Sequence, residues 1–357
     1  MYCKYSILII ALMGSMQSFS QKTLDNLVEK SSGKAKTTYT ANKIGVTLVR
    51  DSIFMLKGRG GNIGVSVGED GVFIIDSQFP DASADILNRI KSLSKKPVKI
   101  LINTHHHGDH VGGNTNLTAG GALLFSHEKA RARMLAPYVE AGRENYQNKI
   151  DSILKLRAPK ISTIEDRKAA TKDAEKIAGT VEDNMDTPDG LFPVVSFSND
   201  LKFNFNGDKI IAVHVPKAHT DGDLIIYFSK SNVIHTGDAF VSNTYPFIDA
   251  NNSGSLDGYL KGLKKITNLM NDETKVIPGH GDIATKEDVL YTYRMLMFLN
   301  DRIAFHILQN KTEDQVAAMG KLTKEFDDKG FGEGFITTER LVRTLYKEID
   351  KTYKKEN

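Results

Sequence analysis

The chain has 357 residues, of which 40% are hydrophobic and 25% are charged, proportions typical of a globular protein with a sizeable core. Its length would fit two domains, although layered α/β folds often exceed 200 residues as one domain. The 47 basic and 44 acidic residues are interspersed and leave a formal net charge of +3, which gives no indication of a nucleic-acid partner.

Residues 1–20 have the pattern of a secretory signal peptide. Lys4 supplies a positive start, residues 5–13 form an apolar run, and Ser18-Phe19-Ser20 places small residues at the positions that a signal peptidase inspects. The apolar run is far shorter than the ~20 residues of a membrane-spanning helix. The only cysteine, Cys3, lies in this segment, so a mature chain would contain neither a disulfide nor a cysteine metal ligand. We therefore expect a periplasmic or secreted protein without a membrane anchor after cleavage.

The first half of the chain alternates strand patterns with turns. A polar segment, 21–43, precedes a domain that we place at 44–285. Short runs of β-branched and apolar residues, bounded by glycine or acidic turns, predict strands, and apolar residues at helical spacing predict a helix that Pro97 ends. The predicted strands are 44–49, 53–56, 63–67, 72–75, 98–102 and 122–125, and the helix is 86–93.

The run His105-His106-His107-Gly108-Asp109-His110 follows the apolar strand 98–102 directly. Imidazole and carboxylate are the usual nitrogen and oxygen ligands of zinc. In an extended segment His105, His107 and Asp109 would point to one side, and His110 would turn with the chain. An internal run that follows a strand is not a purification tag, and we interpret it as part of a metal site.

The second half of the chain begins with a charged segment, 128–190, that we interpret as a helical insertion. Strand patterns resume at Val194 and lead to three further polar residues, His219, Asp238 and His280, each just past an apolar strand. A single histidine in such a place is more often structural, but three such positions beside the histidine run favour a metal site. Helices are predicted over 256–270, from Thr285, which forms a capping box with Asp288, and along a final stripe, within a C-terminal region of 286–357.

These motifs resemble the metallo-β-lactamase superfamily. The resemblance rests on Asp76 after its strand, the histidine run, Ala218-His219-Thr220, Thr236-Gly237-Asp238 and Pro278-Gly279-His280-Gly281, in the order of that family. It implies an α/β fold of four layers, an αββα sandwich, over about residues 44–285. It also implies two zinc ions: His105, His107 and His219 would hold one, Asp109, His110 and His280 the other, and Asp238 would bridge them.

The same resemblance implies a hydrolase in which two zinc ions share a hydroxide that attacks the substrate. Asp109 and Asp238 are the expected catalytic residues. True β-lactamases carry Cys or Ser where this chain has Asp238, so family membership does not fix the substrate. We rank small carbonyl substrates (β-lactam, lactone or thiolester) first. Phosphodiester or sulfate-ester hydrolysis, or a metal-binding sensor without turnover, are the alternatives.

Further site residues are suggested by position alone. Asp76 would either cap the following helix or orient a metal ligand. Asn62, Tyr245 and Phe247 lie on loops after strands and are candidate substrate contacts, although such residues are more often packing or turn residues. The 128–190 insertion would cover the mouth of the site, or else form a surface appendage or an oligomer contact. The oligomeric state stays open.

Overall fold

The computed structural model describes residues 44–356. The expected signal peptide and the polar segment 21–43 therefore lie outside the described residues. Within 44–356, no helix combines the length and apolar character needed to cross a membrane.

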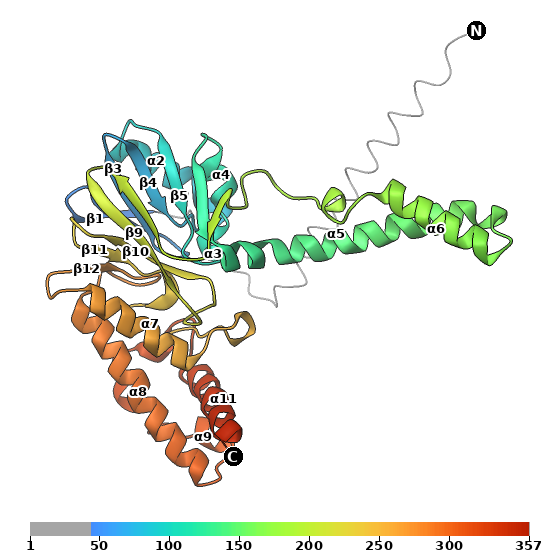
Figure 1. Ribbon diagram of the computed structural model, residues 1–357. Coiled ribbons are helices and arrows are strands. Elements are labelled where there is room, and N and C mark those ends of the chain that lie inside the picture. The colour runs from blue at the N-terminus through green and yellow to red at the C-terminus, as the bar shows by residue number, and fades with distance from the viewer. Residues whose placement is uncertain (1–43, 357) are drawn as a thin grey trace. The chain divides into compact units, whose positions relative to one another are not determined.

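Twelve strands of the described chain form two sheets that face each other (Figure 1). The larger sheet is ordered β1 to β7 as in the chain, antiparallel from β1 to β4 and parallel from β4 to β7. The smaller sheet has the order β12-β11-β10-β9-β8 and is antiparallel except for the β11–β12 pair. The strands are β1 Gly45–Arg50, β2 Ile53–Lys57, β3 Ile63–Gly68, β4 Gly71–Ile75, β5 Val98–Ile102, β6 Leu123–His127, β7 Val195–Phe197, β8 Leu201–Phe205, β9 Asp208–Val215, β10 Asp223–Phe228, β11 Val233–His235 and β12 Lys275–Ile277.

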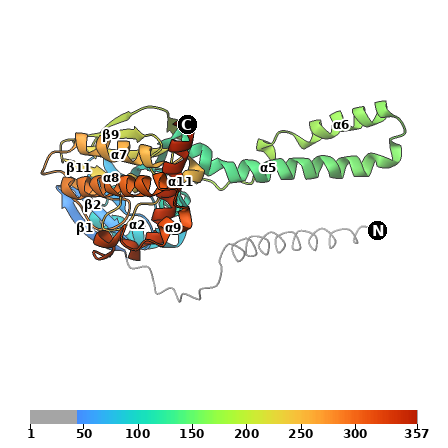
Figure 2. The same cartoon turned by 90° about the horizontal axis from the view of Figure 1, so that it is seen from below.

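Helices cover the outer face of each sheet (Figures 1 and 2). The larger sheet packs against α2 (Ser83–Leu93) and α4 (Asn114–Thr118), and the smaller sheet packs against α7 (Leu256–Leu269), α8 (Lys286–Leu308) and α11 (Thr338–Glu356). The remaining helices are η1 Pro80–Ala82, α3 Gly108–Val111, α5 Glu128–Arg157, η2 Ala158–Lys160, α6 Ile164–Ala178, η3 Glu182–Asn184, η4 Gly237–Ala239, η5 Ala250–Asn252, α9 Glu313–Ala317, α10 Lys324–Asp327 and η6 Phe331–Glu333. The four layers confirm the αββα sandwich.

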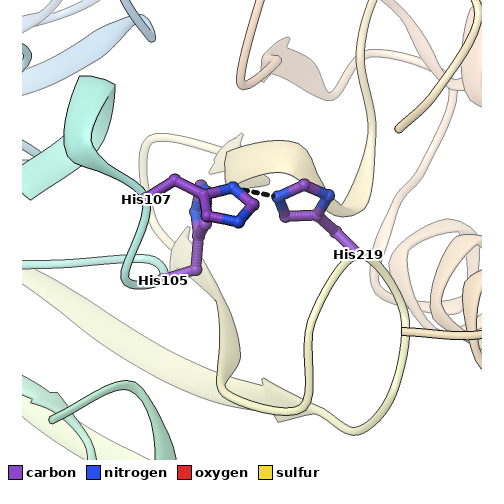
Figure 3. A group of neighbouring side chains, drawn as sticks. All are labelled: His105, His107 and His219. Atoms are coloured by element: carbon purple, nitrogen blue, oxygen red, sulfur yellow. Dashed lines mark hydrogen bonds between the residues drawn. The ribbon is translucent and has the colours of Figure 1, made fainter. Parts of the chain in front are cut away.

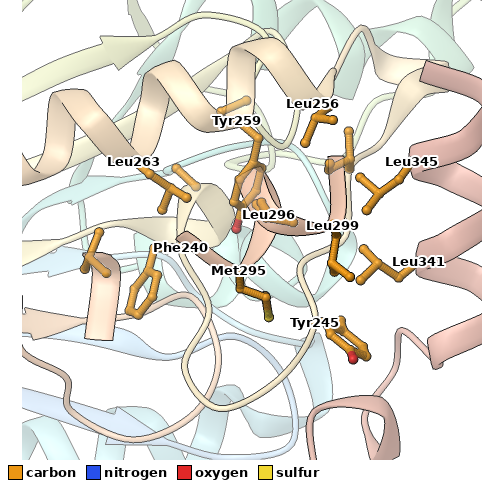
Figure 4. Close-up of a cluster of buried hydrophobic side chains, with 14 of the residues drawn as sticks. Phe240, Tyr245, Leu256, Tyr259, Leu263, Met295, Leu296, Leu299, Leu341 and Leu345 are labelled. Atoms are coloured by element: carbon orange, nitrogen blue, oxygen red, sulfur yellow. The ribbon is translucent and has the colours of Figure 1, made fainter. Parts of the chain in front are cut away.

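Alternation along the buried strands explains the layers. In β4, Phe73 and Ile75 face the core between the sheets, whereas Val72 and Ile74 face the outer layer with Ile86 of α2. Successive strand residues point to opposite faces, so a strand covered on both sides must be apolar throughout. A third cluster joins the smaller sheet to the C-terminal helices; the side chains labelled in Figure 4 belong to it and are Phe240, Tyr245, Leu256, Tyr259, Leu263, Met295, Leu296, Leu299, Leu341 and Leu345.

The insertion forms a two-helix hairpin with a small core of its own. Ile150 of α5 packs against Ala174 and Ala178 of α6, away from the three sandwich clusters. In both views of the ribbon the hairpin leads away from the sheets. The expectation of a cover over the site is therefore wrong for most of the insertion. Some apolar side chains of α5 and α6 pack against each other, and Leu156, Ile164 and Ile177 are exposed. Only the first turns of α5 lie beside the site, where Arg133 donates hydrogen bonds to Asp221 and Asn252.

Two smaller expectations also differ from the structure. Residues 114–118, for which no helix was predicted, form α4 directly after Gly113. Thr285 does form the expected capping box with Asp288 at the start of α8. Between α8 and α11, however, the short helices α9 and α10 add to the predicted pair of closing helices.

Candidate metal centre

Loops from both sheets bring the seven expected ligands together. The connection from β5 to α3 carries His105, His107, Asp109 and His110. The other three come from loops next to strands of the smaller sheet. His219 precedes β10, Asp238 lies in η4 after β11, and His280 follows β12. Because α3 begins at Gly108, Asp109 and His110 lie in its first turn, and the ring of His110 is 4.2 Å from that of His105.

The first group of ligand atoms comes from His105, His107 and His219 (Figure 3). Their nitrogen atoms lie within 4.8 Å of one another, and His107 Nδ1 is 2.8 Å from His219 Nε2. All three rings converge on one point, as a single cation would require.

The second group comes from Asp109, His110 and His280. His280 Nε2 lies 3.2 Å from the Asp109 carboxylate and 3.4 Å from His110 Nε2. Two imidazoles and one carboxylate form a ligand set that zinc commonly takes.

Asp238 lies between the two groups. Its Oδ1 is 3.2 Å from His110 Nε2 and 3.6 Å from His280 Nε2, so it faces the second group. Its Oδ2 is 3.7 Å from His219 Nε2 and faces the first group. The two oxygens of one carboxylate thus point to both groups.

Unpartnered buried atoms show that these residues fit metal ions. His105 Nε2 and Asp238 Oδ1 are buried and make no hydrogen bond. Leaving such atoms unpaired in a protein interior costs about 1–3 kcal/mol each, so most buried polar atoms have a partner. A cation bound between the ligands would supply the missing partner for both atoms.

Burial sets the charge state of the first group. It lowers the pKa of His105 well below its usual range, with further lowering from His110 and His219. Burial also lowers the pKa of His219, to about 4. Both rings are therefore neutral near pH 7, which is the form that binds a metal.

The second group is dominated by opposite charges. Burial alone would lower the pKa of His110, but Asp238 and Asp76 raise it well above its usual value. Burial would raise the pKa of Asp238, but His280 and His110 lower it well below its usual range. Asp238 is therefore an anion at neutral pH and attracts a positive charge to the point where the groups meet.

Two glycines allow the backbone to approach the ligands closely. A Cβ atom at Gly61 would overlap the imidazole of His110, and one at Gly279 would overlap Oδ1 of Asp238. The glycine-rich turn at 58–62 therefore packs against the metal centre.

Asp76 holds the second group from behind. Its carboxylate accepts hydrogen bonds from the backbone N–H and the hydroxyl of Thr104, both at 2.7 Å, and lies 2.8 Å from His110 Nδ1. This contact leaves His110 Nε2 to face the ligand group. Of the two roles considered for Asp76, orienting a ligand is the one its contacts fit, since α2 has no side-chain cap.

Asp249 plays the corresponding part for the first group and was not singled out from the sequence. Its carboxylate lies 2.9 Å from His107 Nε2 and accepts a hydrogen bond from Asn252 Nδ2. Asp249 also accepts from the backbone of Asn251 and Asn252 at the start of η5. In the sequence, Asp249 is only an aspartate before a turn, because its partner His107 is 142 residues away.

The three residues suggested as substrate contacts have different surroundings. Asn62 is buried, and its amide donates to the carbonyls of Pro278 and Gly281, so it holds the loop that carries His280. Tyr245 is also buried and donates to Asp327; as a substrate contact it is wrong, because its hydroxyl is used inside the protein. Phe247 is half-buried and stacks beside His107, with ring centroids 5.9 Å apart.

Known proteins with related sequences point to one family. The family model of the metallo-beta-lactamase superfamily matches residues 56–280. A linear primary-alkylsulfatase from Pseudomonas sp. (strain ATCC 19151) is 20% identical over 278 residues, which cover 71% of this chain and 48% of that protein. The chain thus spans about half the length of this curated relative.

Solved structures show the same fold. The sec-alkylsulfatase Pisa1 from Pseudomonas sp. superposes with a TM-score of 0.57 at 16% identity, over 85% of this chain and 50% of that chain. The DIM-1 metallo-beta-lactamase superposes with a TM-score of 0.50 at 14% identity, over 71% of this chain and 97% of that chain. The family model matches more than half of the chain, and the chain therefore belongs to the metallo-beta-lactamase superfamily.

Proposed function

We propose that the chain is a dinuclear zinc hydrolase that cleaves a small carbonyl substrate of the β-lactam, lactone or thiolester type. The observation that carries the dinuclear part is the placement of Asp238, whose two oxygens face the two ligand groups separately. A single tetrahedral ion would use four ligands, whereas seven residues converge here.

Each side chain would have a defined role. Two zinc ions, when bound, lower the pKa of a shared water toward 7 and stabilise negative charge that develops on the substrate. His105, His107 and His219 would hold one ion, Asp109, His110 and His280 the other, and Asp238 both. Burial would raise the pKa of Asp109, but its hydrogen bond with His280 lowers the pKa, so Asp109 is an anion that can accept and hold a water proton.

The surroundings of the first group favour an uncharged electrophile. Phe247 packs against His107 and His219, so an aromatic ring borders these ligands directly. Arg133, the arginine near His106, is engaged by Asp221. A sulfate monoester carries one negative charge on the reacting group itself and would be stabilised by an unpaired cation beside these ligands.

Sulfate-ester hydrolysis is the second candidate, because the curated relative and one of the similar structures are alkylsulfatases. A sensor domain without turnover is less well supported, since all seven ligand positions are filled. We also propose that the protein is exported, on the signal-like pattern of residues 1–20, and that its partner is a small-molecule substrate.

One preparation of the zinc-loaded protein tests these candidates together. Its rates are measured on a chromogenic cephalosporin, a lactone, a thiolester, an alkyl sulfate and a phosphodiester, and its zinc content is determined by elemental analysis. We expect close to two zinc ions per chain and turnover of at least one carbonyl substrate. Hydrolysis of the alkyl sulfate alone would select the second candidate, and one ion per chain would overturn the dinuclear proposal.

A further inference from the structure

We propose that Phe247, Phe335 and Arg340 form a substrate subsite, which we call the aromatic–arginine wall, for an anionic group attached to an apolar or aromatic group. The inference deepens the proposed function and rests on it for the position of the reacting bond. It assigns a binding role to the C-terminal region, which supplies two of the three residues.

The wall begins at the metal centre. Phe247 contacts two ligands of the first group: its ring stacks beside His107 at an interplanar angle of 17°, and its centroid is 5.5 Å from that of His219. Its backbone carbonyl accepts a hydrogen bond of 2.6 Å from His219 Nδ1. A substrate moiety that packs against Phe247 would therefore lie beside the first ligand group.

Phe335 and Arg340 continue the wall outward. The ring of Phe335 meets that of Phe247 edge-on, with centroids 5.8 Å apart. The guanidinium of Arg340 lies 4.8 Å from the centroid of Phe247 and 4.6 Å from that of Phe335. One cation therefore contacts both rings.

The exposed ring of Phe335 lies on a well-anchored loop. Phe335 is 74% exposed, yet its neighbour Ile336 is buried in the core of the C-terminal helices. Asp327 accepts hydrogen bonds from both Tyr245 and Thr338, and so ties the Phe247 loop to the start of α11. A large apolar ring held in solvent by such a frame is suited to contact a ligand.

The charge of Arg340 is not neutralised within the described chain. Its neighbour Arg343 pairs with Glu313, Asp314 and Glu339, whereas no carboxylate is within ion-pair distance of Arg340 among residues 44–352, whose side chains the structure describes. A guanidinium can stack on rings through its face while its N–H groups donate to a carboxylate or sulfonate. The wall thus offers apolar surface and one free positive charge to an amphiphilic monoanion.

Binding of a non-hydrolysable probe tests the wall. Zinc-loaded protein is titrated by calorimetry with 3-phenylpropane-1-sulfonate, whose sulfonate is a poor zinc ligand, and with the uncharged methyl 3-phenylpropyl sulfone. We expect Arg340→Gln to weaken binding of the sulfonate about 3- to 10-fold, as loss of a partly exposed ion pair would, and to leave the sulfone unaffected. Phe335→Ala should weaken both probes. Arg89→Gln, which removes an exposed arginine from α2, is the matched control and should change neither.

The contrary results are equally specific. Equal affinities for sulfonate and sulfone, unchanged sulfonate affinity in Arg340→Gln, or no binding to the parent protein in the millimolar range would each overturn the wall. Turnover does not enter this measurement. A protein that hydrolyses no carbonyl substrate but shows the expected pattern would lose the proposed function and keep the wall.

Discussion

At the scale of single residues, the orientation of each histidine decides which nitrogen it can offer to a metal. His107 directs Nδ1 toward His219, and its Nε2 meets the carboxylate of Asp249. When the proton of a neutral ring is held at Nε2 by a carboxylate, the lone pair at Nδ1 is free for a metal. Asp249 is thus a positioning residue for the first ligand group.

Substitution of Asp249 should weaken one metal site more than the other. Asp249→Asn keeps an oxygen that can cap η5 but removes the charge that holds the His107 proton, and we expect metal affinity at the first group to fall about 10- to 100-fold. Competition with a chromogenic chelator measures both affinities. Asp257→Asn on the exposed start of α7 is the control. Unchanged affinity at both sites would show that His107 needs no support.

The grouping of the seven expected ligands could be predicted from the sequence, but most of the residues that support them could not. Four ligands fall within six residues, and the other three each follow an apolar strand, so local patterns were sufficient. The partnership of Asp249 with His107 and the burial of Tyr245 depend on which distant loops meet. Side-chain chemistry alone did not reveal that Tyr245 faces Asp327 rather than a substrate.

At the scale of elements, the strands could be predicted from local sequence patterns, whereas the placement of the insertion could not. A buried strand such as β4, predicted as 72–75 and found at Gly71–Ile75, can be recognised by its continuous apolar residues. The insertion was recognised as helical, but its direction was not predictable, since a few apolar residues in a charged segment can pack against the body or against each other. Pro137 lies inside α5, one turn after Arg133.

Removing the outer part of the hairpin should leave the metal centre intact. Gly142 of α5 packs against Val181 and Met185, so the two chain segments already meet there. A short Gly-Ser linker in place of residues 143–180 would join them and keep Arg133 with Asp221. We expect unchanged zinc content and unchanged relative rates on small and large substrates.

A matched variant separates the hairpin from its base. Arg133→Ala leaves the hairpin in place but removes its hydrogen bonds to Asp221 and Asn252, the residue that donates to Asp249. This substitution should lower activity several-fold through the loops around His107. A shift in substrate ranking in the linker variant, with Arg133→Ala normal, would restore the idea of a cover.

At the scale of the whole molecule, the metal centre connects the two sheets. The larger sheet leads into His105, His107, Asp109 and His110, while His219, Asp238 and His280 lie beside strands of the smaller sheet. The core between the sheets is apolar, with Phe73 packed against Phe203 and Phe228. Cations held by ligands from both sides would add a polar link at one end of this core.

Zinc removal should therefore destabilise the entire sandwich rather than one loop. A ligand present at 1,000 times its dissociation constant stabilises a folded protein by about 4 kcal/mol. For a domain of this size that corresponds to a fall in melting temperature on the order of 10 °C when zinc is removed. The unpartnered His105 Nε2 and the buried charge of Asp238 add to the cost in the metal-free protein.

Differential scanning calorimetry with and without a chelator measures the fall in melting temperature, and restored zinc should reverse it. A variant with His105→Gln and Asp238→Asn should show a much smaller zinc-dependent shift. An identical melting temperature in parent protein proven free of metal would show that the two sheets are held together without the metal centre.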